Sequence, residues 1–203
     1  MGQAYQERKT QVVRKSSETE ISCSLNIDGK GEARIKTQIG FLDHMLALFA
    51  FHGFFDMELL VQKADLQIDI HHTNEDIGIV LGKTFKKALD EKQGIRRFGS
   101  GFAPMESTLG HTVIDIGGRG YFSHNLTPGQ DQEGYSLSYM EHLLESFAHS
   151  LGATLVVQVS GQSNDLHTNL ETVFKSLGLA LDQATQIDPR RAATVPSTKG
   201  VID

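Results

Sequence analysis

The sequence contains very little cysteine and no tryptophan: Cys23 is the one thiol among 203 residues. A single cysteine forms neither an intramolecular disulfide nor a thiolate metal site, so both are excluded. Positive charge is also scarce, because 19 lysines and arginines stand against 25 acidic residues, for a formal net charge of -6. Dedicated nucleic-acid binders carry a basic stripe, and we therefore expect no nucleic-acid partner.

Long hydrophobic runs are missing as well. A helix needs about 18 or more apolar residues to span a bilayer. The most apolar stretch, residues 41–60, is interrupted by five polar side chains, Asp43, His44, His52, Asp56 and Glu58. The opening residues, MGQAYQERK, lack the apolar segment of a signal peptide. We therefore expect no membrane partner and a cytoplasmic location.

Histidine, by contrast, is abundant, with nine residues. Residues 42–53 open with an acidic residue and a histidine before an apolar helical pattern, and residues 71–89 open with His-x-x-x-Glu. Residues 140–152 and 167–181 show both features again in the same order. The two His-x-x-x-Glu units begin 96 residues apart, at positions 71 and 167. This order and spacing predict a duplicated unit of about a hundred residues, a usual domain size.

The duplication predicts one compact unit in two halves, residues 1–95 and 96–190, followed by a tail at 191–203. Between the helical segments, alternation of apolar and polar residues predicts strands. The expected strands lie at 21–27, 33–37, 56–61 and 66–70 in the first half and at 108–116, 121–125 and 155–159 in the second. The fold class is therefore α+β: two tandem pseudo-repeats, each a roughly four-stranded sheet with two helices packed on one face.

Histidine and glutamate at helical spacing carry the clearest chemical signal. His71 and Glu75 lie four residues apart and so share one helical face, which the second half repeats at positions 167 and 171. One such pair is usually a solvated ion pair, but the repetition favours a site for zinc, manganese, iron or nickel, which accept nitrogen and oxygen ligands. His72 points about 100° further round the helix, which suggests two ions rather than one. The expected metal ligands are therefore His44, His71, His72, Glu75, His142, His167 and Glu171.

A second group of candidate residues is cationic. It comprises Arg97, Arg119, Lys175 and Lys199. Scattered cations usually belong to a solvated surface, but Lys199 lies close to Ser197 in a loop, residues 196–200, that contains proline and glycine. A hydroxyl, an ammonium and backbone N–H groups in such a loop are able to bind a phosphate.

Nine short motifs follow one another along almost the whole chain. They are SETEI (17–21), GFLDHML (40–46), HGFFD (52–56), HHTNED (71–76), GIRRFG (94–99), GGRGY (117–121), EH (141–142), FKS (174–176) and PSTKG (196–200). In this order they resemble the imidazoleglycerol-phosphate dehydratase family of histidine biosynthesis. The resemblance implies a hydro-lyase that converts D-erythro-imidazole glycerol phosphate to imidazole acetol phosphate. It also implies a homo-oligomer, a 24-mer with active sites between neighbouring subunits.

The resemblance further implies roles for single residues. Two Mn²⁺ ions are expected, one held by His71, Glu75, His142 and a further histidine, and the other by His44, His72, His167 and Glu171. Glu18 matches the acid/base carboxylate of the family, and His52 matches a substrate-contacting histidine. The residues that match its phosphate-binding set are Arg97, Arg119, Lys175, Ser197 and Lys199.

The implied reaction explains why such residues are needed. Removal of water beside an imidazole ring takes a proton from a carbon atom that is not acidic. Metal ions at the ring nitrogens supply Lewis acidity for the charge that develops on the ring. A carboxylate such as Glu18 moves the proton as a general acid/base, and phosphate contacts hold the substrate in register.

The chain departs from the family pattern at one metal ligand. Thr168 stands where the family has a histidine, and Asp165 is a candidate replacement. The other departures from the pattern include Leu48, Ile70, Ser107, Gly120 and Val156. Even the groups that orient a metal ligand are worth about 10–100-fold in affinity or activity, so losing the ligand itself costs at least as much. Two alternatives stay open: a non-catalytic or weakly active paralogue that binds metal or ligand, and a related lyase on another phosphorylated heterocycle.

Overall fold

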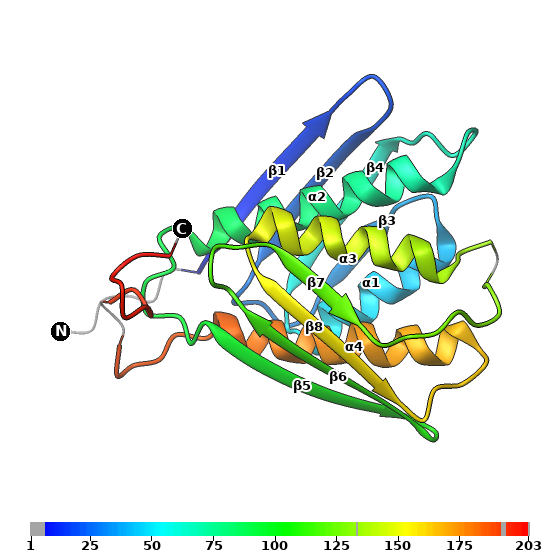
Figure 1. Cartoon of the computed structure of the whole chain (residues 1–203). Helices are drawn as coiled ribbons and strands as arrows, with labels where there is room; N and C mark the ends of the chain where they lie inside the picture. The colour runs from blue at the N-terminus through cyan, green and yellow to red at the C-terminus, as the bar shows by residue number, and fades with distance from the viewer. Residues whose placement is uncertain (1–6, 133, 192–193, 203) are drawn as a thin grey trace.

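In a computed structural model, which describes residues 7–132, 134–191 and 194–202, both halves fold into the same succession of elements (Figure 1). The first half comprises β1 (Lys9–Lys15), β2 (Glu20–Asn26), β3 (Ala33–Lys36), α1 (Gly40–His52), β4 (Asp56–Lys63) and α2 (Ile70–Leu89). The second half comprises β5 (Phe98–Met105), β6 (Thr108–Asp115), β7 (Tyr121–His124), α3 (Leu137–Leu151), β8 (Thr154–Ser160) and α4 (Leu166–Thr185). The predicted α+β class with two tandem halves is confirmed.

The two sheets have the same strand order, β1-β2-β4-β3 and β5-β6-β8-β7. In each sheet the first three strands in this order pair antiparallel, and the last two pair parallel. A parallel pair needs a long crossover connection. Helix α1 provides it between β3 and β4, and helix α3 provides it between β7 and β8.

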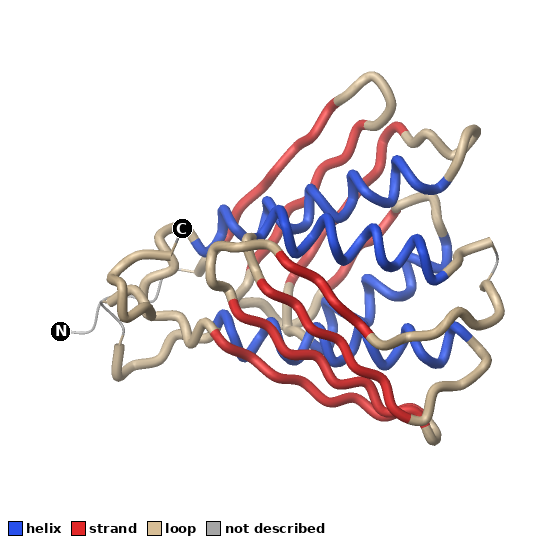
Figure 2. Tube along the Cα trace, in the orientation of Figure 1, coloured by secondary structure: helices blue, strands red, loops and turns tan. Residues whose placement is uncertain are grey.

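The four helices lie between the two sheets (Figure 2). Helix α2 packs on β1 and β2, and α4 packs on β5 and β6. The helices also pair across the halves, α2 with α3 and α1 with α4. Alternate apolar residues of the strands face this helical layer, and on β2 they are Ile21, Cys23 and Leu25. The helices therefore cover the inner face of each sheet, as the sequence predicts.

Two glycines set how closely the helix pairs approach. A Cβ on Gly178 of α4 would lie 2.5 Å from the carbonyl oxygen of Phe49 on α1. A Cβ on Gly82 of α2 would lie 2.5 Å from the carbonyl oxygen of Phe147 on α3. Because glycine has no Cβ, the backbones pack directly against each other at both points. The two glycines are 96 residues apart and so occupy equivalent positions in the repeat.

The strand prediction is wrong in three places. Residues 66–70 are not a strand, because they form a turn in which Asp69 caps α2 and Ile70 begins it. The sequence pattern also fails to predict β1 and β5. Strand β1 lies at a sheet edge and buries none of its residues fully, so its apolar signal is weak. Strand β5 turns Gly99 and Gly101 towards α4, and glycines give no apolar alternation.

The tail after α4 is tied to the beginning of the second half. Gly94 accepts a hydrogen bond from the Asp188 N–H and donates its own N–H to the Thr194 carbonyl. These bonds bring the loop at 196–200 to the beginning of β5. Among the described residues, no helix combines the length and the apolar character needed to cross a membrane.

Candidate active site

The first cluster of predicted metal ligands lies between α1 and α4 and comprises His44, His167 and Glu171. Glu171 Oε2 lies 3.2 Å from His167 Nε2 and 3.5 Å from His44 Nε2. Neighbouring donors on an octahedral ion with bonds of about 2.2 Å stand about 3 Å apart. The two imidazoles and the carboxylate therefore fit a borderline divalent ion in both chemistry and spacing.

Glu171 is the charged member of this cluster. Burial alone would raise the pKa of its carboxyl group, but Lys175 and the hydrogen bonds from His44 and His167 outweigh burial, and the pKa lies below its usual value. Lys175 Nζ pairs with Glu171 Oε1, while Oε2 faces the histidines. The carboxylate is thus ionised at neutral pH, which is the form that binds a metal ion.

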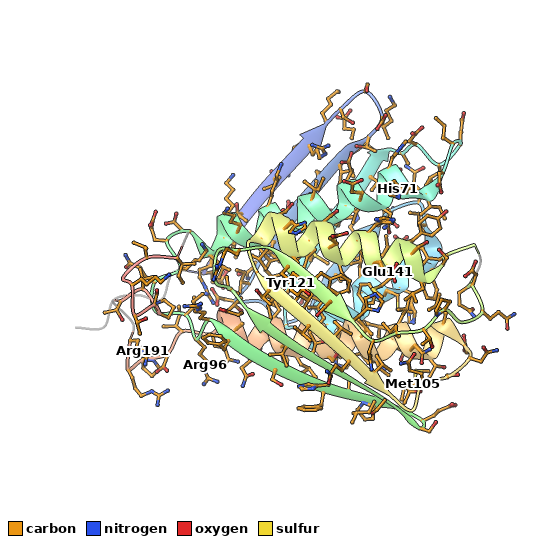
Figure 3. The ribbon with its side chains drawn as sticks, viewed as in Figure 1. His71, Arg96, Met105, Tyr121, Glu141 and Arg191 are labelled. Atoms are coloured by element: carbon orange, nitrogen blue, oxygen red, sulfur yellow. The ribbon has the colours of Figure 1, made fainter. Side chains whose placement is uncertain are left out.

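The second cluster lies between α2 and α3 and contains His71, Glu75 and His142. His71 Nε2 is 3.6 Å from Glu75 Oε2, one helical turn along α2. The rings of His71 and His142 meet edge to face, with their centroids 4.4 Å apart. Figure 3 shows His71 on α2 and Glu141, the neighbour of His142, on α3 at the same end of the helical layer. His71 is therefore the neighbour of both Glu75 and His142, although the donor atoms of the three do not all lie within 4.8 Å of one another as those of the first cluster do.

His72 belongs to a third cluster, with Glu18 and Asp65. His72 Nδ1 lies 2.9 Å from Asp65 Oδ2 and 4.0 Å from Glu18 Oε2. The hydrogen bond to Asp65 raises the pKa of His72 above its ordinary value. The resemblance assigns His72 to the same ion as His44, yet the chain itself assembles only three of those four ligands.

Glu18 is held by the turn between β1 and β2. Ser16 Oγ accepts hydrogen bonds from the N–H groups of Glu18, at 3.2 Å, and Thr19, at 3.0 Å. Thr19 Oγ1 donates to Asp76 Oδ2 on α2 at 2.5 Å. The turn is thereby attached to the helix that carries His72, and the carboxylate of Glu18 is left exposed to solvent beside that histidine.

Thr168, at the position of the missing histidine, is part of the cap of α4. Its side chain is buried, and its hydroxyl donates to Asp165 Oδ2 at 3.3 Å. Asp165 Oδ1 accepts from the His167 N–H at 2.9 Å and from Gln132 Nε2 at 2.7 Å. Both oxygens of Asp165 are engaged in capping, so this carboxylate does not stand in the cluster as a replacement ligand.

His52 lies at the end of α1 and is half-buried. Burial and the positive charge of Lys175 lower the pKa of His52, against the opposing effect of Glu171. The imidazole is therefore neutral at pH 7 and has one donor and one acceptor nitrogen. This state suits a residue that hydrogen-bonds a substrate.

A cavity of about 300 Å³ gathers four of the five predicted phosphate ligands, namely Arg97, Arg119, Ser197 and Lys199. Asp115 holds Arg97 through two bonds, Nε to Oδ1 at 2.6 Å and Nη2 to Oδ2 at 3.0 Å, and raises the pKa of the guanidinium. Arg97 Nη1 also donates to the Pro196 carbonyl at 3.1 Å, which joins the tail to β5. Three cations and a hydroxyl in one cavity suit a phosphate dianion. Lys175 is the exception, because it lies in the cluster of Glu171.

The phosphate cavity and the first metal cluster lie at opposite ends of α4. The Arg97 N–H donates to the Ala184 carbonyl near the end of this helix, whereas His167 lies in its first turn. At about 1.5 Å per residue, the helix between these positions is about 25 Å long. Figure 3 shows the same separation, with Arg96 at one end of the molecule and His71 at the other. A small phosphorylated substrate does not reach both within one chain.

Three aspartates of the site do not follow from the sequence pattern. Asp65 contacts His72, Asp115 contacts Arg97, and Asp76 holds the turn that carries Glu18. A lone aspartate produces no periodic signal, so only the structure reveals these contacts. Asp76 is also the last residue of the HHTNED motif, but the motif does not show which side chains it contacts.

Comparison with known proteins places these features in a family. The family model described as imidazoleglycerol-phosphate dehydratase matches residues 37–181. Relatives named imidazoleglycerol-phosphate dehydratase from Thermoanaerobacter sp. and Methanocella arvoryzae are 46% and 45% identical over 196 residues, which are 96% of this chain and 100% of each relative.

Solved structures give the same likeness. IGPD from Pyrococcus furiosus superposes with a TM-score of 0.80 at 33% identity, over 94% of this chain and 99% of that one. Imidazoleglycerol-phosphate dehydratase from Staphylococcus aureus superposes with a TM-score of 0.77 at 27% identity, over 88% of this chain and 100% of that one.

Proposed function

The chain belongs to the imidazoleglycerol-phosphate dehydratase family and is a hydro-lyase of histidine biosynthesis, and from this premise we propose how its residues perform the reaction. The substrate is D-erythro-imidazole glycerol phosphate, the product is imidazole acetol phosphate, and the reaction takes place in the cytoplasm. The observation that carries the proposal is the gathering of histidine and glutamate ligands on adjacent helices, because these donors suit metal ions that polarise an imidazole ring.

The family is metal-dependent, and we propose that the donor sets of this chain bind two Mn²⁺ ions in the assembled protein. His44, His167 and Glu171 would hold one ion, and His71, Glu75 and His142 would hold the other. When bound, the ions supply Lewis acidity for charge that develops on the imidazole ring. The ionised Glu171 and the neutral His52 support this arrangement, because the first binds a cation and the second contacts an uncharged or anionic ring.

Neighbouring subunits complete the site in this proposal. The cluster of His44 and the phosphate cavity lie about 25 Å apart along α4, and His72 lies in a cluster separate from that of His44. A homo-oligomer, a 24-mer by resemblance, would bring the phosphate cavity and His72 of one chain to the metal cluster of another. The substrate would then be held by its ring on one side and by its phosphate on the other.

The chain's own residues perform the proton transfer and the binding. Glu18 is an exposed carboxylate next to His72 and would exchange the carbon-bound proton as a general acid/base. Arg97, Arg119, Ser197 and Lys199 would hold the phosphate, and Asp115 keeps Arg97 in place for that contact. Lys175 offsets the charge of Glu171 until a cation is bound.

A weakly active or non-catalytic metal-binding paralogue is the second candidate. It is favoured by Thr168, whose hydroxyl is committed to Asp165 and so leaves one ligand position without a donor from that residue. Metal counting separates the two candidates. Two tightly held ions per subunit support the enzyme, and one or none supports the paralogue.

The direct test is turnover of imidazole glycerol phosphate by the purified protein with Mn²⁺. The matched variants are Glu18→Gln and Glu20→Gln, because Glu20 is a nearby carboxylate that pairs with Lys15. We expect product from the wild type and from Glu20→Gln, and a rate reduced by about 100-fold or more in Glu18→Gln. Equal rates in the wild type and in Glu18→Gln would show that Glu18 is not the acid/base group.

A further inference from the structure

Asp65 contacts His72 from the loop between β4 and α2. Its Oδ2 lies 2.9 Å from His72 Nδ1, and its backbone N–H donates to Thr73 Oγ1 at 2.9 Å. The residue is therefore bonded twice to the first turn of α2, once through the side chain and once through the backbone. The Asp65 side chain is 18% exposed, against 42% for His72, so the carboxylate is the more enclosed partner of the pair.

Such a carboxylate decides which nitrogen of a histidine is available. A hydrogen bond from Nδ1–H to a carboxylate keeps the proton on Nδ1 and leaves Nε2 as a lone-pair donor. The same bond restrains rotation of the ring. In metal sites, a ligating histidine usually donates its other N–H to a carboxylate or carbonyl in this way, and the partner is worth about 10–100-fold in metal affinity or activity.

The second half of the chain provides an internal comparison. The position equivalent to His72 is Thr168, and the segment between β8 and α4, residues 161–165, contains one carboxylate, Asp165. That carboxylate caps α4 and accepts from the Thr168 hydroxyl. The first half, by contrast, has Asp69 as the cap of α2 and Asp65 as an additional carboxylate. The histidine and its orienting carboxylate are thus present together in one half and absent together in the other.

We infer that Asp65 is a positioning residue that keeps His72 in the Nδ1–H form and presents its Nε2 as a metal donor. This inference rests on the proposed role of His72 as a metal ligand. It assigns to Asp65 a function in metal binding that does not require Asp65 to touch the ion. The inference also explains the presence of Asp65 in this loop, because Asp69 already caps α2.

The test measures the tautomer of His72 and the affinity for Mn²⁺ on the assembled full-length protein. The variants are Asp65→Asn, Asp65→Ala and His72→Ala. The matched control is Asp69→Asn, which removes a charge from the same loop but keeps a good helix cap. Nitrogen-15 chemical shifts of the metal-free protein report the tautomer, and competition with a chelator reports the Mn²⁺ affinity.

We expect the Nδ1–H form in the wild type and in Asp69→Asn, and loss of that preference in Asp65→Ala. We expect both Asp65 variants to bind Mn²⁺ about 10- to 100-fold more weakly, with the thermal midpoint of Asp65→Asn close to that of Asp69→Asn. If His72→Ala weakens Mn²⁺ binding but neither Asp65 variant does, the inference is wrong and the proposed ligand role of His72 stands. If His72→Ala leaves the affinity unchanged, the ligand role itself fails, and the inference fails with it.

Discussion

Asp76 on α2 accepts a 2.5 Å hydrogen bond from the hydroxyl of Thr19, and both side chains are buried. The second oxygen of Asp76 accepts from Arg14 Nε on β1 at 2.7 Å. One carboxylate therefore joins the helix that carries His72 to the strand and turn that carry Glu18. Asp76 therefore helps to fix the placement of a proposed ligand relative to the proposed acid/base group.

Asp76→Asn is expected to reduce both stability and turnover. The amide retains the size of the side chain but loses the charge that pairs with Arg14, which costs about 1–3 kcal/mol in the free energy of unfolding. Because the turn that carries Glu18 is then less firmly placed, kcat falls by about 10- to 100-fold with little change in KM. Urea unfolding and steady-state kinetics measure these effects. Glu91→Gln, at an exposed position, is the control and should leave kcat unchanged. A fall in kcat in this variant equal to that in Asp76→Asn would contradict the assignment.

Arg97→Lys is expected to raise KM for the phosphorylated substrate by about tenfold, with a smaller effect on kcat. Lysine keeps the charge but lacks the planar fork that bonds Asp115 at two points and also reaches Pro196. The neighbouring residue offers a matched control, because Arg96 lines a different cavity with Asp188 and Arg190. Arg96→Lys should leave KM unchanged. An equal rise in KM for both variants would mean that general surface charge, not the cavity of Arg97, binds the phosphate.

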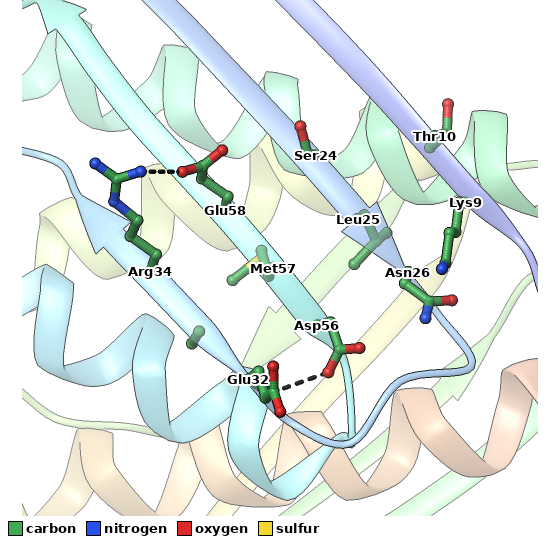
Figure 4. Close-up of a pocket in the computed structure, with 11 residues that line it drawn as sticks. Lys9, Thr10, Ser24, Leu25, Asn26, Glu32, Arg34, Asp56, Met57 and Glu58 are labelled. Carbon is green, nitrogen blue, oxygen red and sulfur yellow. Dashed lines mark hydrogen bonds and ion pairs between the residues drawn. The ribbon is translucent and has the colours of Figure 1, made fainter.

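Asp56 is expected to contribute an acid-sensitive part of the stability. It lines a hollow on the outer face of the first sheet, where Figure 4 shows its contact with Glu32. Its carboxylate accepts the N–H groups of Lys30, at 2.7 Å, and Glu32, at 3.1 Å. Burial would raise the pKa of Asp56, but these backbone donors outweigh it, and the pKa lies below the usual 3.8. A carboxyl group whose pKa is lowered by folding stabilises the protein above its unfolded pKa, and this contribution is lost as the pH falls below about 3.8.

The measurement is the free energy of unfolding between pH 2 and pH 6. In Asp56→Asn it should fall less steeply with acid than in the wild type, while the variant is less stable at pH 6. Asp131→Asn, at an exposed loop position, is the control. Identical acid slopes for the wild type and Asp56→Asn would show that the hydrogen bonds of Asp56 do not control this pH dependence.

Thr168→His is expected to strengthen metal binding. The imidazole would restore the donor that the first half supplies through His72, and the affinity for Mn²⁺, measured by competition with a chelator, should rise by about 10- to 100-fold. Thr168→Val is the control, because it removes the hydroxyl bond to Asp165 without adding a donor. If the histidine variant binds Mn²⁺ no more tightly than the wild type, another residue fills the position in the assembled protein.

Much of the fold and of the candidate site follows from the sequence because its signals are periodic. The ligands His71 and Glu75 share a helical face, and the repeat of this pair 96 residues later reveals the duplication. Apolar alternation identifies β2, β3, β4, β6, β7 and β8. It fails for β5, whose Gly99 and Gly101 face α4, and for β1, which is an exposed edge.

The remainder of the site depends on contacts between distant segments. The sequence around Asp65 does not indicate its hydrogen bond with His72, and the sequence around Asp115 does not indicate its bond with Arg97. The apolar run near Ile70 is consistent with either a strand or the start of a helix, and the Asp69 cap decides in favour of the helix. The sequence also does not show how far the cluster of His167 lies from the phosphate cavity. That distance depends on which end of α4 each of them occupies.

The pairing of helices across the halves has a consequence for the symmetry of the metal clusters. The first and second metal clusters each lie between one helix from each half. In each helix pair, one of the equivalent glycines, Gly82 or Gly178, allows the two backbones to pack directly against each other. A single half, with one helix of each pair, would need a second copy of itself to form either cluster. Two identical halves would give two identical sites. Joining the halves in one chain allows the two sites to differ, and Thr168 opposite His72 is such a difference.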